Sequence, residues 1–545
     1  MLSPLLLLLL PQTVSPTQAG PGTTGQGPGF IYYDFLDHEG GPLRGGRVLI
    51  EIGNPLHVDD GSVIQEATSA STTLMDNGPS ANRIDIVFVG DGYQAAEIPA
   101  YAADVDGILP VFFAKEPLDA YMTFFNVHRV DVVSVDSGVD NDPVQGIFRN
   151  TALDMQYWCG GTERLLCVNV GKARNQANCA PEADQILALA NSSKYGGAGY
   201  PSSDLGTLAA DNGSAIEIAL HEFGHSMGDL ADEYDYGGPT TYSGPERPEA
   251  NVSIYDATQM GSLQTKWHLW LSQAGVGTFE GGYYSQFGVY RPTSNSLMRN
   301  LGRPFQGINR EQMIFKIYEE VDPIDAATDP TQCDPNAVYA LTLVQPTDHA
   351  LDVQWQLDGV DISGATGDSF DASTLGLAPG NYELSVTVVD NTPWVRDEAK
   401  RASLMTKTRS WMLSVAGVAS VNPGNANPAS LSVGGSQLGR PVFGETIDLF
   451  VNASGTTGHT MSTVIGFFGG LNLTLGGGQV LLVDISDPGG EVFGFALQNG
   501  DFALTGLPVV NDPSLCGLEV HAQGVHLFGV TPFALSNAQV LTLGY

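Results

Sequence analysis

Two histidines four residues apart, with a glutamate between them, carry the clearest chemical signal in the chain. His221, Glu222 and His225 form a His-Glu-x-x-His pattern. On a helix, positions i and i+4 project from nearly the same face, so both neutral imidazoles can bind one zinc ion. Glu222 points about 100° away from His221, which keeps it off the metal but within reach of a zinc-bound water. The pattern predicts a zinc site with a carboxylate general base; a chance match on an ordinary amphipathic helix is the alternative.

The residues before this pattern predict the helix that must carry it. Ser214 is followed three positions later by Glu217, which is the spacing of a capping box at a helix N-terminus. Apolar residues at helical spacing lead from there into His221. We therefore expect a helix that begins after Ser214 and presents both histidines on one face.

Length and charge limit the class of protein. With 545 residues the chain is too long for a single hydrophobic core, so we expect several domains. The net charge is −37 with only 23 Lys and Arg residues, which argues against a nucleic-acid partner because phosphate binding needs clustered positive charge. The acidic run 136–142 resembles an oxygen cluster for Ca²⁺, and a solvated acidic loop is the alternative.

The N-terminus has the pattern of an export signal. Leucines occupy positions 5–10, and small residues precede Gly20 as in a cleavage site, so we expect a signal peptide over 1–19 and a secreted, extracellular protein, with retention at the cell surface left open. Six leucines are too short to cross a bilayer, and no later segment is long and apolar enough. We therefore expect no transmembrane anchor.

Five cysteines suggest disulfides in an exported protein. They occupy positions 159, 167, 179, 333 and 516. We expect the first four to form two disulfides around the catalytic region, in one of three connectivities, and Cys516 to be the odd one. The alternative is that all five are buried thiols.

Hydrophobic patterns along the chain indicate successive folded units. Short apolar runs between Gly and Asp turns predict a small β unit over 30–74. Apolar strand patterns at 84–89 and 125–133, on either side of a helical pattern at 95–113, predict an α/β layer. The Gly-rich run 191–200 is a loop or edge strand near the active site, or a plain connector. Alternating short strands from 337 to 417 predict an immunoglobulin-like sandwich.

The zinc-binding pattern continues as His221-Glu-Phe-Gly-His-Ser-Met-Gly-Asp-Leu-Ala-Asp-Glu-Tyr234, which resembles the IgA-peptidase family of zinc metalloendopeptidases, the sixty-fourth metallopeptidase family. Further motifs extend the resemblance over roughly residues 75–415, among them Gly90-Asp-Gly-Tyr, Phe125-Asn-Val, Cys159-Gly-Gly-Thr-Glu-Arg-Leu-Leu-Cys and Leu297-Met-Arg. The resemblance implies a secreted bacterial zinc endopeptidase with a metzincin-like catalytic domain. It also implies that Met298 forms the Met-turn beneath the metal, with a plain core methionine as the alternative.

The third zinc ligand is expected in the segment after the helix. Asp232 is eleven residues after His221, so on an unbroken helix it would lie roughly 16 Å further along the axis. It can reach the metal only if the helix ends near Gly228, which tolerates a left-handed turn, and the chain folds back. Metzincin-like sites place this ligand ten residues after the first, which here is Ala231. We predict Asp232 as the ligand and Glu233 as the alternative.

The predicted fold class is therefore multidomain: a metzincin-like α/β zinc peptidase domain, preceded by a small β unit and followed by two all-β sandwich-like domains. The expected boundaries are 1–19 for the signal peptide, 20–80 for the linker and small β-rich unit, 81–325 for the catalytic domain, 333–418 for the immunoglobulin-like sandwich, and 421–545 for a C-terminal β-rich accessory domain.

In the implied reaction zinc acidifies its water and polarises the scissile carbonyl, while Glu222 accepts the proton and passes it to the leaving amine. Tyr234, Tyr290 and Arg310 are candidates to contact the substrate or the oxyanion. The expected partner is a protein or peptide, with a cell-surface or matrix ligand for the C-terminal β domains. Rival hypotheses are a non-catalytic adhesion protein stabilised by zinc, against which an intact Glu222 argues, and an esterase or amidase.

Overall fold

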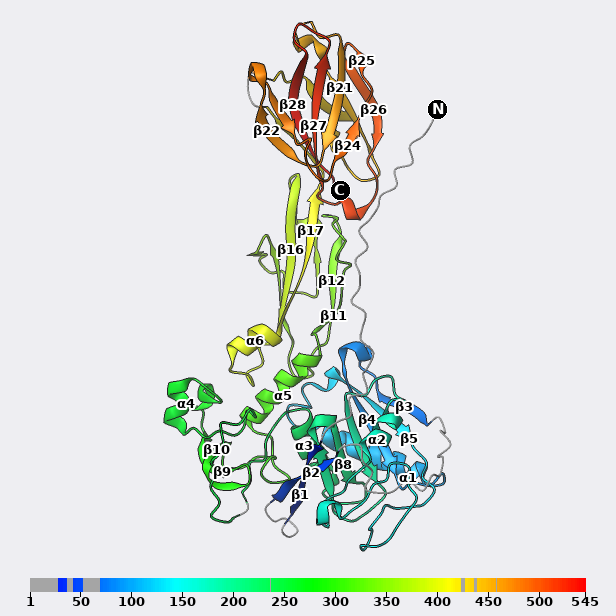
Figure 1. The fold of residues 1–545 in the computed structure, drawn as a ribbon, viewed down its shortest axis with the longest axis vertical. Helices are drawn as coiled ribbons and strands as arrows, with labels where there is room; N and C mark the ends of the chain where they lie inside the picture. The colour runs from blue at the N-terminus through cyan, green and yellow to red at the C-terminus, as the bar shows by residue number, and fades with distance from the viewer. Residues whose placement is uncertain are drawn as a thin grey trace.

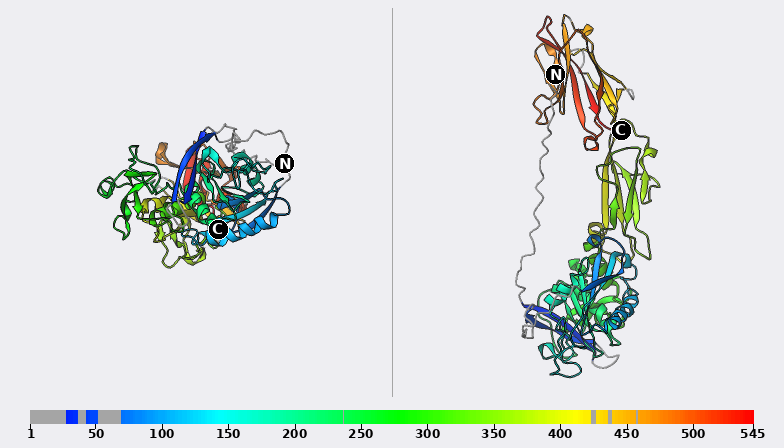
Figure 2. Two further views of the ribbon diagram at one scale, coloured as in Figure 1. Left: turned by 90° about the horizontal axis from the view of Figure 1, so that it is seen from below. Right: turned by 90° about the vertical axis from the view of Figure 1, so that its right-hand side faces the viewer.

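The computed structural model describes an elongated molecule in three parts. The described residues are 28–36, 43–51, 69–235, 237–422, 427–435, 439–456 and 458–545. A mixed sheet with helices forms one end, a β-sandwich the middle, and a second all-β unit the other end (Figures 1 and 2). The expected signal peptide over 1–19 and residues 20–27 of the expected linker lie outside the described residues. In the part of the chain that is described, no helix has the length and apolar character that crossing a membrane requires.

An eight-stranded sheet is the centre of the first part. Four strands form its parallel core: β4 (Ile84–Asp91), β5 (Phe125–Asp131), β6 (Gln185–Ala190) and β8 (Leu205–Ala209). The others pair antiparallel with their neighbours: β1 (Pro28–Leu36), β2 (Leu43–Glu51), β3 (Ala70–Met75) and β7 (Gly197–Tyr200). The order across the sheet is β2-β1-β7-β8-β6-β4-β5-β3.

Helices cover both faces of this sheet, because its central strands are apolar on both sides. Ile86 and Phe88 of β4 face one core, whereas Val87 and Val89 face the other. The first core includes residues of α1 (Ile98–Phe112), α3 (Ala215–Ser226) and α5 (Gly307–Glu320), and the second includes residues of α2 (Val170–Ala177). A small lobe beside them contains α4 (Ala257–Leu263) and the hairpin of β9 (Val276–Gly282) and β10 (Ser285–Thr293).

The region expected to be a separate small β unit extends the large sheet instead. Its described strands β1 and β2 add to the sheet beyond β7, and β3 adds to the opposite edge beside β5. An exposed strand edge carries unpaired N–H and C=O groups, which short β segments can satisfy by pairing. The Gly-rich run 191–200 ends in β7, which is a strand of this sheet and lies between β1 and β8.

Two all-β units complete the chain. The middle unit packs a sheet of β11 (Ile324–Ala327), β12 (Val338–Leu343) and β15 (Ser369–Asp371) against one of β13 (Asp352–Leu357), β14 (Val360–Asp361), β16 (Gly380–Val389) and β17 (Thr406–Val415). Helix α6 (Glu398–Leu404) precedes β17. The last unit contains β18 (Gly417–Val421), β19 (Leu431–Gly435), β20 (Thr446–Val451), β21 (Met461–Phe467), β22 (Gly470–Thr474), β23 (Val480–Val483), β24 (Glu491–Gly494), β25 (Gln498–Asn499), β26 (Phe502–Pro508), β27 (Glu519–Leu527) and β28 (Phe533–Thr542).

A buried carboxylate joins the first part to the middle unit. Asp390 is fully buried and accepts hydrogen bonds from the hydroxyl groups of Tyr121 (2.7 Å) and Tyr318 (2.8 Å). Nε2 of His349 lies 2.8 Å from its other oxygen. Because these partners come from both parts, the network fixes their junction.

The disulfides differ from the sequence expectation. Cys159 pairs with Cys167, and Cys333 pairs with Cys516, whereas Cys179 is a free, exposed thiol. Cys516 is therefore not the odd cysteine, and the alternative of five free thiols is wrong as well. Disulfide-bonded cysteines usually have Cα atoms about 4.4–6.8 Å apart. The fold brings Cys333 and Cys516 to 6.4 Å although 183 residues separate them, so the bond ties the two all-β units together.

This bond predicts a local effect on stability. Replacing both cysteines, Cys333→Ser with Cys516→Ser, should lower the free energy of unfolding of the all-β units by about 2–5 kcal/mol, because the unfolded chain gains freedom when the long loop opens. Scanning calorimetry measures the change, and Cys159→Ser with Cys167→Ser is the matched control that should destabilise the first part instead. Equal melting of the all-β units in wild type and the Cys333/Cys516 variant would contradict the prediction.

Candidate metal centre

Helix α3 carries the His-Glu-x-x-His pattern, but its N-terminus differs from the expectation. The helix begins after Ser214 as predicted, yet no side-chain capping bond forms there. The backbone N–H of Ser214 donates to the side chain of Asn212 (2.9 Å), so it is not available to Glu217. The carboxylate of Glu217 instead accepts from Nζ of Lys115 (2.9 Å). The capping box is therefore wrong, because tertiary partners compete for both of its groups.

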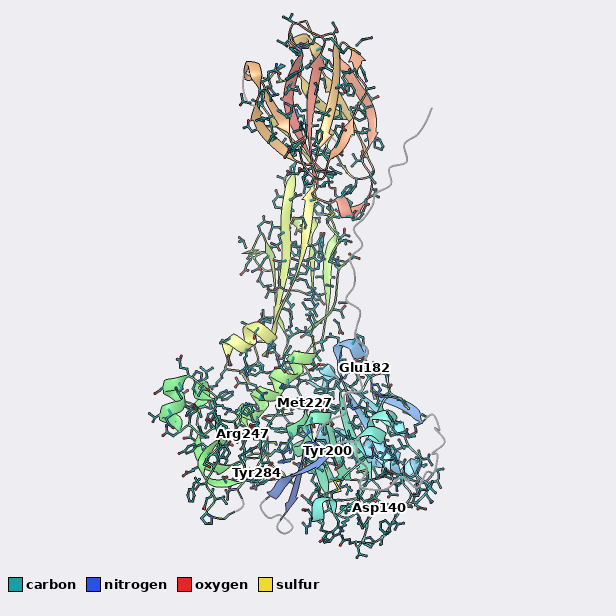
Figure 3. The ribbon with its side chains drawn as sticks, in the orientation of Figure 1. Asp140, Glu182, Tyr200, Met227, Arg247 and Tyr284 are labelled. Atoms are coloured by element: carbon teal, nitrogen blue, oxygen red, sulfur yellow. A yellow bond between two sulfur atoms is a disulfide. The ribbon has the colours of Figure 1, made fainter. Side chains whose placement is uncertain are left out.

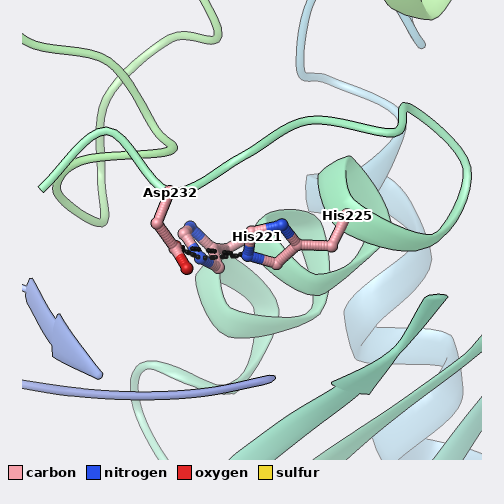
Figure 4. A group of neighbouring side chains, drawn as sticks. All are labelled: His221, His225 and Asp232. Atoms are coloured by element: carbon pink, nitrogen blue, oxygen red, sulfur yellow. Dashed lines mark hydrogen bonds and ion pairs between the residues drawn. The ribbon is translucent and has the colours of Figure 1, made fainter. Parts of the chain in front are cut away.

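Three side chains converge beside this helix (Figure 4). Nε2 of His221 lies 3.1 Å from Nε2 of His225, and Oδ1 of Asp232 lies 3.1 Å and 3.2 Å from these two atoms. All three residues are buried, with at most 2% of their surface exposed. Among the residues that the structure describes, this is the group of His, Cys, Asp and Glu side chains placed to hold a metal ion.

A reversal of the chain after α3 brings Asp232 to the histidines. The helix ends at Ser226, and the N–H of Leu230 returns to the carbonyl of Gly224 (3.0 Å). The sequence suggested that Gly228 would adopt the left-handed conformation, but the residue that does so is Asp229 (φ 49°). Gly228 serves close packing instead, since a Cβ there would lie 2.7 Å from the Gly224 carbonyl oxygen.

Backbone carbonyls orient both imidazoles through the Nδ1 atoms. Nδ1 of His221 lies 3.1 Å from the carbonyl oxygen of Leu297, and Nδ1 of His225 lies 2.6 Å from that of Leu230. A carbonyl only accepts, so each Nδ1 carries the proton and a neutral ring presents the Nε2 lone pair to its neighbours. Two lone pairs and a carboxylate oxygen then face one another, an arrangement that a cation stabilises.

The donor set fits zinc. A tetrahedral zinc ion with ligands at about 2.0 Å needs them about 3.3 Å apart, and the three separations here are 3.1–3.2 Å. Burial alone would raise the pKa of the Asp232 carboxyl, but when a proton instead of a metal ion is shared within the group, the positive charge and hydrogen bonds of the adjacent imidazoles outweigh burial and hold that pKa below its usual value. The carboxylate form that a metal requires is therefore favoured.

Glu233, the alternative ligand, faces away from the group. Its buried carboxylate accepts hydrogen bonds from Asn251 (3.0 Å), Ser296 (2.7 Å) and Asn309 (2.8 Å). Burial raises the pKa of the Glu233 carboxyl, and these three hydrogen bonds act in the opposite direction. Glu233 thus anchors the reversed segment, while Asp232 supplies the third donor.

Tyr284 was not found from the sequence. It lies in the turn between β9 and β10 at φ 65°, and its hydroxyl donates to Oδ2 of Asp232, the oxygen that does not face the histidines. Its ring packs on that of Tyr234 with centroids 5.5 Å apart. Figure 3 marks its position. Two adjacent tyrosines after a glycine pair, where turn residues are expected, were the available signal.

Glu222 lies on the sheet side of α3, against two facing glycines. Gly199 of β7 pairs with Gly206 of β8 in the strand register. A Cβ on Gly199 would lie 2.2 Å from Oε2 of Glu222, and a Cβ on Gly206 would lie 3.4 Å from the Glu222 Cβ. The glycine pair therefore makes the space that this carboxylate occupies next to His221.

Met298 is buried under α3. A Cβ on Gly224 would come within 2.7 Å of its sulfur, and its carbonyl accepts from the N–H of Glu233 (2.7 Å). The segment containing Met298 thus contacts both the helix and the reversed chain that carries Asp232. The Met-turn that the resemblance implied for Met298 stays a prediction.

The other candidate contacts are placed differently. Tyr290 lies on β10, where its backbone pairs with Ser253. Arg310 forms an ion pair with Glu116 and stacks on the ring of Trp394 at 4.2 Å. These partners engage the Arg310 side chain away from the three donors, and no contact of Tyr290 with them is seen among the described residues.

A cavity of about 820 Å³ opens beside His225. Its lining includes aromatic, basic and acidic residues: Trp267, Trp270, Tyr283, Phe315, Arg247, Lys266, Lys400, Asp229, Glu249, Glu311 and Asp397. The acidic run 136–142 forms no comparable group in the described chain. The Asp136 and Asp140 carboxylates accept backbone N–H groups of Asn150 (2.7 Å) and Arg149 (2.5 Å).

Residues 72–276 match the family model described as IgA Peptidase M64. The matched segment includes the three donors and Glu222, and it ends before Met298. A peptidase implies a protein or peptide substrate. No curated protein matches the chain.

Isosteric variants separate the two acidic candidates. Asp232→Asn should lower zinc affinity by at least about 100-fold, because loss of a charged ligand exceeds the 10–100-fold cost of losing a residue that supports one. Glu233→Gln keeps the shape of its site and should retain one zinc ion. Metal content after dialysis measures both. Metal loss confined to the Glu233→Gln variant would reverse the assignment.

Tyr284 should act on the metal through Asp232. Tyr284→Phe removes only the hydroxyl that orients this carboxylate, so zinc affinity should fall about 10–100-fold with the fold unchanged. A competition titration with a chelating dye measures the affinity. Tyr290→Phe is the control and should bind zinc like the wild type; equal affinity in both variants would show that the hydroxyl has no such role.

Proposed function

Since residues 72–276 match the model of the IgA-peptidase family, we propose that this protein is a secreted, zinc-dependent endopeptidase with a metzincin-like site and Glu222 as the general base. The observation that carries the proposal is the convergence of His221, His225 and Asp232 through three acceptor atoms, with a carboxylate next to them in the chain. The three acceptor atoms can bind a metal ion, and the carboxylate of Glu222 can serve as the base that hydrolysis requires.

The chain's own residues define the reaction. A bound zinc ion acidifies water and polarises a scissile carbonyl. Glu222 takes the proton from the attacking water and delivers it to the leaving amine, and no covalent bond to the protein forms. Because the side chain of Glu222 is confined over the glycine pair, its carboxylate is held in one place during both transfers.

The substrate class follows from the space around the site. The cavity beside His225 is large enough for side chains of a peptide, and its mixture of aromatic and charged residues suits amphipathic ones. A small ester or amide would use little of it, so an endopeptidase is favoured over an esterase or amidase. Binding of a cell-surface or matrix ligand by the C-terminal unit, and of Ca²⁺ by the run 136–142, stay predictions from the sequence.

Two disulfides support export. Such bonds form and persist in oxidising compartments, and one of them here connects the two all-β units. They agree with the signal-peptide pattern at 1–19. Secretion is therefore part of the proposal, and retention at the cell surface remains compatible with it.

The role of the base is tested by a nearly isosteric change. Glu222→Gln should keep both imidazoles and one zinc ion but lower kcat by about 10²–10⁴, because it removes the group that accepts the proton. Hydrolysis of unfolded casein and of a fluorogenic peptide, with and without a zinc chelator, provides the measurement. Activity within about tenfold of the wild type at matched zinc content would refute this mechanism. Chelator-insensitive hydrolysis by the wild type would refute the zinc dependence.

A further inference from the structure

The candidate site is closed on the side of the sheet. Glu222 and His221 have no exposed surface, and His225 and Asp232 have 2% and 1%. Glu222 packs on β7 at Gly199, so a peptide that passes this carboxylate on the side of the sheet would lie along β7. What pairs with β7 therefore decides whether a peptide can bind on that side.

Strand β7 offers one edge to a peptide. Its other edge is paired with β8 over four positions, from Gly197 with Leu208 to Tyr200 with Leu205. An extended peptide can add to an unpaired strand edge through backbone hydrogen bonds, and this mode suits substrates of varied sequence. A peptide on the free edge of β7 would run past Gly199, directly beside the Glu222 carboxylate.

That edge is already occupied by the chain's own strand β1. Tyr32 pairs antiparallel with Gly199, which is the position against which Glu222 packs. Ile31 is fully buried and belongs to the same apolar cluster as Ala198 and Tyr200 of β7. The pale violet-blue ribbon at the lower left of Figure 4 belongs to this hairpin.

We propose that the hairpin β1–β2 is an internal inhibitor that occupies the edge of β7 where an extended peptide substrate binds. The inference rests on the proposed peptidase function. The hairpin must leave this edge before the substrate's backbone can pair there, either by opening or after cleavage of the chain between Glu51 and Ser69.

The hairpin is built to be separable. β1 and β2 pair with each other over nine positions, from Pro28 with Glu51 to Leu36 with Leu43. In contrast, the register described between β1 and β7 contains one pair, Tyr32 with Gly199. Most of the described backbone pairing of β1 is therefore with β2, and this pairing would survive release of the hairpin from the sheet.

Two substitutions in the full-length protein should release it by different physical means. Ile31→Asp places a carboxylate in an apolar cluster, and Tyr32→Pro removes a backbone N–H from a strand paired on both sides. If the hairpin is closed in about nine molecules of ten, release raises kcat/KM on a fluorogenic peptide about tenfold. Ile31→Val keeps the apolar contact and is the matched control, with activity like the wild type.

Amide hydrogen exchange of β7 and zinc content are measured on the same samples. Faster exchange at Gly197–Tyr200 in either releasing variant, with full zinc and unchanged kcat/KM, would overturn the inhibitory role while leaving the peptidase proposal intact. Inactivity of the wild type and of all released, zinc-loaded variants would instead refute the proposed function, and the inference with it.

A peptide added in trans gives an independent test. The sequence of residues 28–36 should inhibit the released variants competitively, and the same peptide carrying Ile31→Asp should not. Failure of the first peptide to inhibit a variant whose β7 amides have become exchangeable would show that this edge is not the substrate's position.

Discussion

The first part of the molecule depends on holding three hydrogen-bond acceptors together. Nε2 of His221, Nε2 of His225 and Oδ1 of Asp232 lie 3.1–3.2 Å apart in a buried setting, where each would repel the others without a shared cation. The surroundings compensate for this cost. Backbone carbonyls hold both imidazoles in the tautomer that leaves Nε2 unprotonated, and the hydroxyl of Tyr284 takes the second oxygen of Asp232.

Glycines let the helix approach its neighbours closely enough to build this site. Gly224 makes room for the sulfur of Met298, and Gly228 lets the chain turn against the Gly224 carbonyl. On the opposite side, Gly199 and Gly206 make room for Glu222 between α3 and the sheet. A Cβ at Gly199, Gly224 or Gly228 would lie less than 3.0 Å from Glu222, Met298 or the Gly224 carbonyl oxygen, so these three positions require glycine for close packing around the site.

The sheet edge links the site to the rest of the chain. Strand β7 is paired with β8 on one side and with β1 on the other, and Glu222 packs on it at Gly199. The two all-β units lie away from this region, joined to it through the buried Asp390 network and to each other through Cys333 and Cys516 (Figure 1). The sheet edge beside Glu222 and the contacts that connect the all-β units therefore lie in different parts of the molecule.

Local patterns in the sequence determined the elements. The continuous apolar run at 84–89 indicated a buried strand, and the spacing of His221, Glu222 and His225 indicated one helical face, because both depend only on neighbours a few residues away. The same logic showed that the helix must end before Asp232 could reach the histidines. These conclusions need no knowledge of what packs against each element.

Tertiary structure decided everything that depends on residues far apart in the chain. Asp232 and not Glu233 lies beside the histidines because Asn251, Ser296 and Asn309 take up the Glu233 carboxylate, and these partners come from two loops and helix α5. The capping box failed because Lys115 competes for Glu217. Cys333 and Cys516 pair because folding brings them together, and Tyr284 meets Asp232 for the same reason. The spacing of residues in the sequence determines the geometry within one helix or strand. Contacts between residues 52 or 183 positions apart, such as Tyr284 with Asp232 and Cys333 with Cys516, form only when the whole chain packs.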